Sequence, residues 1–272
     1  MIPRTMMSAA LAILCASVPA AAEVKRLQPD FTFRRVTVPN SGSTGPRINV
    51  QVAPKPAVTP AAAATPDPSP QPPAPAATWF WDAISPATSD SGPGRLEDAL
   101  NLISNPPSGG GVGAPRLQNL QDIAKAQGAD ILRETVGTNV SPALVVALIA
   151  VESAGQVSVE SSAGAVGLMQ LMPATAERFG VTQREVPAEN IKGGVAYLSW
   201  LMDHFDNDPI LVLAGYNAGE GAVRQNAGVP PYNETRNYVP KVLAAFQVAK
   251  GLCQTPPELV SDGCVFAVSN IN

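Results

Sequence analysis

An unbroken apolar run most constrains the fold of this chain. Residues 143–151 contain no polar side chain. The preceding Ser141-Pro142 is typical of a helix start, with serine as the cap and proline at the first helical position. A helix that is apolar on every side is buried. The pattern therefore predicts a buried helix that ends at Glu152, inside a unit large enough to surround it.

Glu152 is the first candidate for chemistry. A carboxylate placed against so much apolar surface loses hydration, which penalises its charged form and raises its pKa. A raised pKa is what a carboxyl group needs to act as a general acid. Twelve positions later, residues 164–167 (GAVG) begin a glycine-spaced segment whose backbone can turn sharply and lie close to a ligand. By themselves, these two features indicate either a strained helix end or the general acid of a glycosidase.

The rest of the compact domain, expected over residues 116–252, is predicted to be helical. Apolar residues recur at helical spacing after residue 116 and again before residue 205, where His204 falls on the solvated side of its helix. Pro240 lies within the first turns of the last helix and is expected to bend or shorten it. The expected helices cover residues 117–136, 173–179, 191–205, 210–217 and 234–250. The fold class is thus mainly α with a Gly-rich insertion, in a unit big enough for a core.

The first 22 residues have the layout of a secretory signal peptide. Arg4 precedes an apolar stretch, and small residues end the segment at Ala22, so cleavage is expected before Glu23 and the mature protein in the periplasm. The apolar stretch is too short for a membrane span. Leu14 precedes Cys15 where lipid-anchor sites carry a small residue, which argues against acylation of that cysteine.

Residues 23–115 are expected to form an extended or disordered N-terminal segment, because the 28 prolines of this 272-residue chain are too many for one compact core. Residues 31–52 alternate weakly and favour either a hairpin or a disordered stretch. The Pro/Ala-rich residues 53–77 form a spacer that reaches roughly 70 Å at about 3.1 Å per residue. Residues 79–81 (WFW) and the amphipathic residues 94–104 form either a docking element or a part of the domain's own packing. Residues 106–115 are interpreted as a flexible hinge.

The cysteines of the exported chain are expected to pair. Cys253 and Cys264 remain after signal cleavage, in a compartment where disulfides persist. Their bond would hold the C-terminal tail, residues 253–272, and stabilise the fold by roughly 3 kcal/mol. Two free thiols are the alternative. A zinc site is disfavoured because His204 is the only histidine and lies far from either cysteine along the chain. No metal or cofactor is expected.

Four motifs in order resemble those of a known family. They are ESAG from residue 152, SSAGAVGLMQLMPATAERFGV from residue 161, LAGYNAGEGAV from residue 213 and ETRNYVPKVL from residue 234. Together they resemble the soluble lytic transglycosylase family of the lysozyme superfamily over about half of the chain. The resemblance implies a lysozyme-like catalytic domain that cleaves the bond between N-acetylmuramic acid and N-acetylglucosamine in peptidoglycan. It implies that Glu152 is the single catalytic carboxylate, first as acid and then as base, and that the muramic acid's own 6-hydroxyl attacks to give a 1,6-anhydro product.

The resemblance also implies substrate-binding residues. Ser161 corresponds to a serine near the reacting sugar, and Gln170 and Met172 to residues of the loop that lines the cleft. Tyr216 and Asn217 correspond to a tyrosine-asparagine pair whose tyrosine hydroxyl lies close to the catalytic carboxyl. Glu234 and Tyr238 correspond to two residues that support the cleft. Purely structural roles are the alternative: Met172 as core filler, Asn217 as a helix-end cap and Tyr238 as a buried aromatic. The chain departs from the family pattern at two glycines, Gly155 and Gly215, where relatives more often carry an aromatic residue and alanine.

Two other functions stay open. A lysozyme-like hydrolase would use a second carboxylate, with Glu160 as the nearest candidate in the sequence, to position water. A non-catalytic module that binds the cell wall would keep the fold and use its N-terminal segment to recruit partners.

The long spacer also suits a monomeric enzyme tethered to a secretion, flagellar or conjugation machinery. The net charge of −4 lacks the basic excess that nucleic-acid binding requires.

Overall fold

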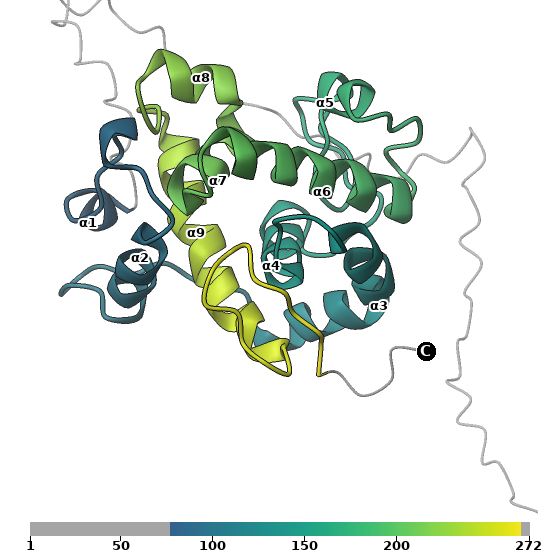
Figure 1. The fold of residues 1–272 in the computed structure, drawn as a ribbon, viewed down its shortest axis with the longest axis horizontal. Coiled ribbons are helices and arrows are strands. Elements are labelled where there is room, and N and C mark those ends of the chain that lie inside the picture. The colour runs from purple at the N-terminus through teal and green to yellow at the C-terminus, as the bar shows by residue number, and fades with distance from the viewer. Residues whose placement is uncertain (1–76, 268–272) are drawn as a thin grey trace, which may run out of the picture. The chain divides into compact units, whose positions relative to one another are not determined.

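The computed structural model describes residues 77–267, and this part of the chain is helical. It contains α-helices, two short 3₁₀ helices and four isolated β-bridges. Within these residues, no β-strand is longer than such a bridge. The predicted mainly α fold is confirmed (Figure 1). The helices are α1 (Thr78–Trp81), α2 (Arg95–Ser104), α3 (Leu117–Thr135), α4 (Pro142–Glu152), α5 (Pro173–Arg178), α6 (Pro187–His204), α7 (Pro209–Ala218), α8 (Glu220–Gln225) and α9 (Asn233–Ala249), with 3₁₀ turns at Thr88–Asp90 and Lys250–Leu252.

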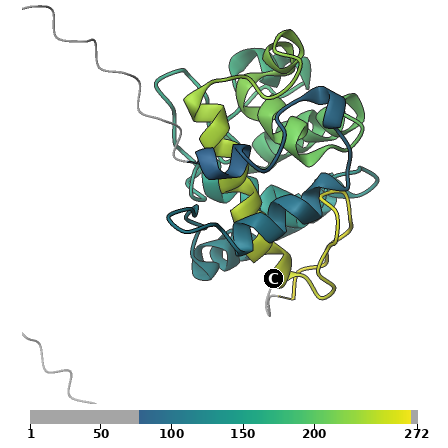
Figure 2. The ribbon, with the colours of Figure 1, turned by 90° about the vertical axis from the view of Figure 1, so that its left-hand side faces the viewer.

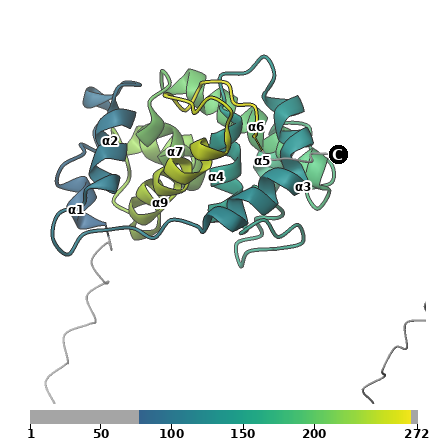
Figure 3. The same ribbon diagram turned by 90° about the horizontal axis from the view of Figure 1, so that it is seen from below.

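Helix α4 lies at the centre of this fold, as its apolar sequence predicts. Every residue from 142 to 150 is buried. Figures 1 and 3 show α4 between α3 and α9, the two helices with which it packs most extensively. The prediction of a buried helix ending at Glu152 is confirmed. Because the helix is apolar all round, burial on all sides is the arrangement that removes most of its surface from water.

The prediction that the Ser141 side chain caps α4 is wrong. Ser141 occupies the cap position, but its hydroxyl makes no capping bond and is buried without a hydrogen-bond partner. Its backbone N–H donates instead to the carbonyl of Val260 in the C-terminal tail, at 2.8 Å. In the first turn, the N–H groups of Leu144 and Val145 donate to the Ser141 backbone carbonyl, at 2.9 and 3.2 Å. A side-chain cap does occur on α7, where the Asp208 carboxylate accepts from the Leu211 N–H at 2.8 Å.

Pro240 does not shorten helix α9, which was one of the two effects expected of it. The helix runs for 17 residues with the proline inside it. Proline has no N–H, so the carbonyl four residues earlier, that of Arg236, loses its helical partner. The indole Nε1 of Trp81 in α1 donates to this carbonyl at 2.7 Å. A side chain from outside the helix thus supplies the missing hydrogen bond.

The segment that precedes the expected domain is folded from residue 77 onward. Phe80 in α1 and Leu96 in α2 are fully buried in the main core. Figure 2, which faces α1 and α2, shows α2 lying across α9, with which it is in contact. The guanidinium of Arg95 pairs with the fully buried carboxylate of Asp208 at 2.9 Å. The expected extended segment and the domain start at residue 116 are therefore wrong for residues 77–104, because their apolar faces pack on the domain itself.

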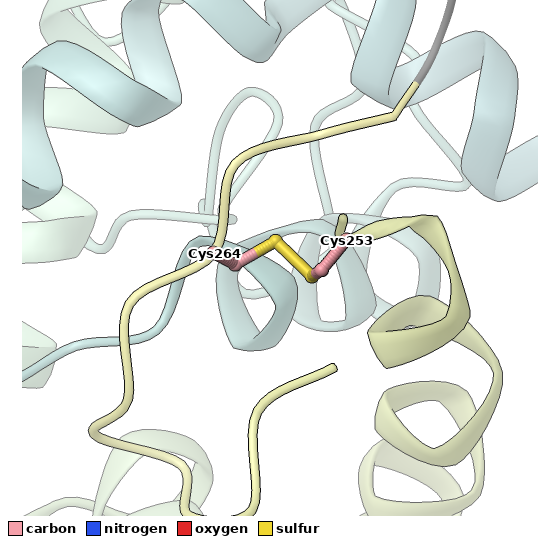
Figure 4. The surroundings of a disulfide bond; sticks show 2 residues. All are labelled: Cys253 and Cys264. Atoms are coloured by element: carbon pink, nitrogen blue, oxygen red, sulfur yellow. A yellow bond between two sulfur atoms is a disulfide. The ribbon is translucent and has the colours of Figure 1, made fainter. Parts of the chain in front are cut away.

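The C-terminal tail is held as predicted. Cys253 and Cys264 form a disulfide with Cα atoms 5.3 Å apart (Figure 4). Backbone hydrogen bonds flank it, from Gln254 to Val265 at 2.8 Å and from Ala267 to Leu252 at 2.7 Å. The tail thereby closes one end of the core, into which both cysteines are buried.

Two further differences concern boundaries. Helix α6 begins at Pro187, four residues before the expected start, and α8, at Glu220–Gln225, lies outside the expected helices. The signal peptide, Cys15, the possible hairpin at residues 31–52 and nearly all of the spacer lie outside the described residues. Within residues 77–267, no helix has the length and apolar character that a membrane crossing requires.

Candidate active site

Glu152 is the last residue of α4 and opens onto a cavity of about 390 Å³. The central helix therefore brings its one carboxylate to the edge of the core, with apolar neighbours behind it and solvent in front. Helix α9 and the end of α7 supply most of the other walls. The cavity is lined by Val151, Glu152, Asn217, Glu234, Asn237, Tyr238 and Lys241.

The electrostatic setting raises the pKa of Glu152 from 4.5 to about 7. Burial is the largest cause, because it penalises the charged carboxylate, and the negative charge of Glu234 adds to the rise. A hydrogen bond from Tyr238 and the positive charge of Lys241 act in the opposite direction. Near neutral pH the carboxyl group is thus present in both forms, as a residue that gives and then takes a proton requires.

Tyr238 forms the closest polar contact with this carboxyl group. Its hydroxyl donates to Oε1 of Glu152 at 2.6 Å. Burial raises the pKa of the Tyr238 phenol well above its ordinary value, so the hydroxyl keeps its proton and remains a donor. The bond orients the carboxyl group from a different helix, α9, and favours its ionised form.

The Tyr216-Asn217 pair lies at the end of α7. The Tyr216 hydroxyl donates to the Met169 carbonyl at 2.8 Å, so it holds the glycine-containing loop, while the hydrogen bond to Glu152 comes from Tyr238. The Asn217 amide oxygen accepts from the Thr235 hydroxyl at 2.7 Å. Asn217 thus reaches across to the start of α9 and lines the cavity together with Glu234.

The loop between α4 and α5 is fixed by side chains from both sides. The Ser153 hydroxyl donates to the Leu168 carbonyl at 2.8 Å. From α6, the fully buried Asn190 amide accepts from the Met169 N–H at 2.7 Å and donates to the carbonyl of Val166 at 2.8 Å. Gly167 has a positive φ of 83°, and an added Cβ would collide with the Asn190 side chain. The glycine is therefore needed for a close approach within the protein itself.

The remaining predicted site residues belong to this loop and are not among those lining the Glu152 cavity. The Ser161 hydroxyl accepts from the Ala165 N–H at 3.0 Å. The Gln170 amide donates to the carbonyls of Val159 and Gly167 at 3.1 and 2.8 Å. Met172 is 41% exposed. The structure thus brings Glu152, Asn217, Glu234 and Tyr238 around one cavity and places Ser161, Gln170 and Met172 in the loop beside it.

Three residues of the site were not expected from the sequence. Asn190 anchors the loop, and Asn237 and Lys241 line the cavity. Asn190 precedes the helix predicted over residues 191–205, so the sequence offered no signal for its buried position. Asn237 and Lys241 lie one helical turn apart on α9, beside Tyr238, so the cavity-facing side of that helix would have indicated both. Residues 77–267 contain no cluster of three His, Cys, Asp or Glu side chains suited to a metal ion.

Comparison with known proteins matches the same part of the chain. Residues 131–239 match the sequence model of the family described as Transglycosylase SLT domain. The soluble lytic murein transglycosylase of Salmonella typhimurium is 36% identical over 135 residues, which cover 41% of this chain and 21% of that protein. A transglycosylase of Enterobacteria phage PRD1 is 37% identical over 115 residues, covering 40% and 41%. The endo-type membrane-bound lytic murein transglycosylase A of Klebsiella pneumoniae is 34% identical over 142 residues, covering 44% and 64%.

A solved structure matches as well. It is that of an inactive mutant of the lytic transglycosylase Slt from Pseudomonas aeruginosa, with 31% identity, a TM-score of 0.45, and coverage of 52% of this chain and 26% of that one. The resemblance inferred from the four motifs is confirmed for the matched region. The chain spans about a fifth of the Salmonella protein and about two fifths of the phage protein.

Proposed function

We propose that this chain, whose residues 131–239 form a domain of the transglycosylase SLT family, is a peptidoglycan lytic transglycosylase. The observation that carries the proposal is the state of Glu152: a carboxyl group at a cavity wall, with a pKa of about 7 and a neutral tyrosine bonded to it. The similarity to enzymes named lytic murein transglycosylases supports peptidoglycan as the substrate.

The reaction needs one group that works twice. Protonated Glu152 gives its proton to the oxygen of the bond between N-acetylmuramic acid and N-acetylglucosamine, and the bond from the anomeric carbon to that oxygen breaks. The ionised carboxylate then accepts the proton of the muramic acid's 6-hydroxyl as that oxygen bonds to the anomeric carbon. The product is a 1,6-anhydro sugar, and no water is consumed. The Tyr238 hydrogen bond stabilises the carboxylate between the two steps.

A hydrolase is the second candidate, because a further carboxylate lines the same cavity. Glu234, and not the exposed Glu160, occupies this position; its carboxylate lies 3.4 Å from the amide nitrogen of Asn217. A hydrolase would need such a carboxylate to activate water. Mass spectrometry of digested sacculi separates the two functions: we expect muropeptides ending in 1,6-anhydro-muramic acid, whereas reducing muramic acid ends would establish hydrolysis.

The role of Glu152 is tested by turnover. Glu152→Gln keeps the shape of the side chain and removes its acid, so we expect loss of activity by about 100-fold or more, the scale of a general acid's contribution. Glu160→Gln, on the neighbouring loop, is the matched control and should keep its activity. Equal activity of Glu152→Gln and the parent chain, or no activity in the parent, would refute the enzymatic proposal and favour a wall-binding module.

Location and partners form a separate part of the proposal. Residues 1–22 support export to the periplasm, and the spacer supports tethering to a secretion, flagellar or conjugation apparatus. Residues 77–104 pack on the domain, so the recruitment proposal is confined to residues 23–76. Pull-down with the mature chain, compared with a chain lacking residues 23–76, tests this. Recovery of the same proteins by both chains would refute recruitment through this segment.

A further inference from the structure

A second cavity adjoins the Glu152 cavity. Its volume is about 360 Å³, and it shares two lining residues, Asn237 and Lys241, with the first. Its other walls are Ala77 and residues 111–113, which precede the region matched by the family. A space next to the candidate active site is thus built in part by a segment that precedes the residues matched by the family model.

The wall formed by residues 111–113 follows a turn that packs on α1. The Gly110 N–H donates to the Pro107 carbonyl at 2.7 Å, and a Cβ on Gly110 would lie 3.1 Å from Cγ of Trp79. This turn therefore packs directly on the Trp79 ring. The expected hinge, residues 106–115, is thus in contact with α1 at this point. Farther along, a Cβ added to Gly111 or Gly113 would meet nothing within 4 Å. These two glycines therefore have open space beside them, where a ligand can lie.

The chemistry of the second cavity differs from that of a sugar site. Lys241 is exposed and is the single charged residue among the described residues that line it. The side-chain oxygen of Asn237 is buried and has no hydrogen-bond partner within the protein. Such an unpaired acceptor is rare and would gain from a ligand N–H once the side chain turns. A cation beside an amide acceptor and open glycine backbone suits a ligand that carries both a carboxylate and amide N–H groups.

We propose that the second cavity binds the peptide stem of a peptidoglycan strand, with Lys241 paired to a stem carboxylate. This inference rests on the proposed function, because the strand must first enter the Glu152 cavity. Within peptidoglycan, the stem peptide attached to muramic acid supplies the carboxylates and peptide amides, while the sugars supply hydroxyl and acetamido groups. A stem on a sugar bound beside Glu152 would reach the adjoining cavity past Lys241.

Two substrates that differ only in charge test the inference. Glycan strands with intact stems are compared with the same strands after their carboxyl groups have been converted to primary amides. We expect the parent chain to cleave the free-acid strands with a kcat/KM roughly tenfold higher, the effect of one charge-assisted hydrogen bond. Equal kcat/KM values for the two substrates would overturn the stem-binding inference and leave the proposed function standing. If neither substrate is cleaved, both the stem-binding inference and the proposed function are refuted.

Matched variants locate the effect. Gly113→Asp adds a negative charge to the wall and should abolish the preference for free-acid strands, whereas Gly113→Asn, of the same size and neutral, should keep it. Lys241→Met should also abolish the preference, and Lys241→Arg should keep it. The measured quantity is the ratio of kcat/KM on the two substrates, so a general loss of activity in a variant does not imitate the result. An unchanged ratio in both Gly113→Asp and Lys241→Met would place the stem elsewhere and refute the proposal.

Discussion

The raised pKa of Glu152 makes a prediction about stability that does not depend on activity. In the folded chain the pKa is about 7, against an ordinary value of 4.5. At 1.36 kcal/mol per pKa unit this difference corresponds to about 3 kcal/mol. Below pH 4.5 the carboxyl group is protonated in both states, and its contribution to stability is fully present. As the pH rises, the unfolded state ionises first, so the free energy of unfolding falls until the folded state also ionises near pH 7.

Glu152→Gln lacks this titration and provides the test. Its free energy of unfolding, minus that of the parent chain, should increase by about 3 kcal/mol between pH 4 and pH 8. Urea unfolding followed by circular dichroism, at matched ionic strength, measures both chains at each pH. Glu160→Gln replaces an exposed carboxyl group and should differ from the parent by no more than about 0.5 kcal/mol throughout. A Glu152→Gln difference that stays constant with pH would refute the argument that burial controls this group.

Two hydrogen bonds from aromatic side chains give further predictions. Tyr238→Phe removes the bond that favours the ionised form of Glu152, so the falling limb of the pH–activity profile should move about one unit higher; an unmoved limb would contradict this. Trp81→Phe leaves the Arg236 carbonyl unpaired and should lower the free energy of unfolding by about 1–3 kcal/mol. In a Pro240→Ala background the restored N–H satisfies that carbonyl, so the cost of Trp81→Phe should fall by about 1 kcal/mol in a double-mutant cycle. Equal costs in both backgrounds would show that the indole bond does not compensate for the proline.

The sequence predicted the elements whose causes are local. The run at residues 143–151 has no polar face, so it could only be a buried helix, and it carries Glu152 to the edge of the core. The same apolar surroundings were sufficient to predict the direction of the Glu152 pKa. The disulfide was predicted from the two cysteines that would remain after cleavage of the predicted signal peptide, and the structure contains it. These features depend on which residues are adjacent along the chain, and adjacency is what a sequence displays.

The errors came from contacts between distant segments. Ser141 stands at a cap position, but its hydroxyl makes no capping bond and its backbone N–H bonds to Val260 in the tail, a contact that no local pattern indicates. Pro240 continues a helix because Trp81, more than 150 positions earlier, donates to the carbonyl that the proline leaves unpaired. The sequence likewise indicated the apolar faces of α1 and α2 but left open whether they dock on a partner or pack on the domain, as the structure has them. In each case the deciding interaction joins residues that only folding brings together.

The sequence by itself determined a helical domain with one acidic residue poised at the end of its central helix, because hydrophobic periodicity and burial act on neighbouring residues. The tertiary structure alone decided which hydroxyl bonds to that acid, which side chain fixes the glycine-containing loop, and which walls the cavity has. Tyr238 and Asn190 act across helices, and their geometry arises from the packing of α4, α6 and α9. The second cavity is the clearest case, since its walls come from residues 77 and 111–113 together with α9. Directional contacts of this kind depend on the relative placement of helices, which the periodicity of each helix does not specify.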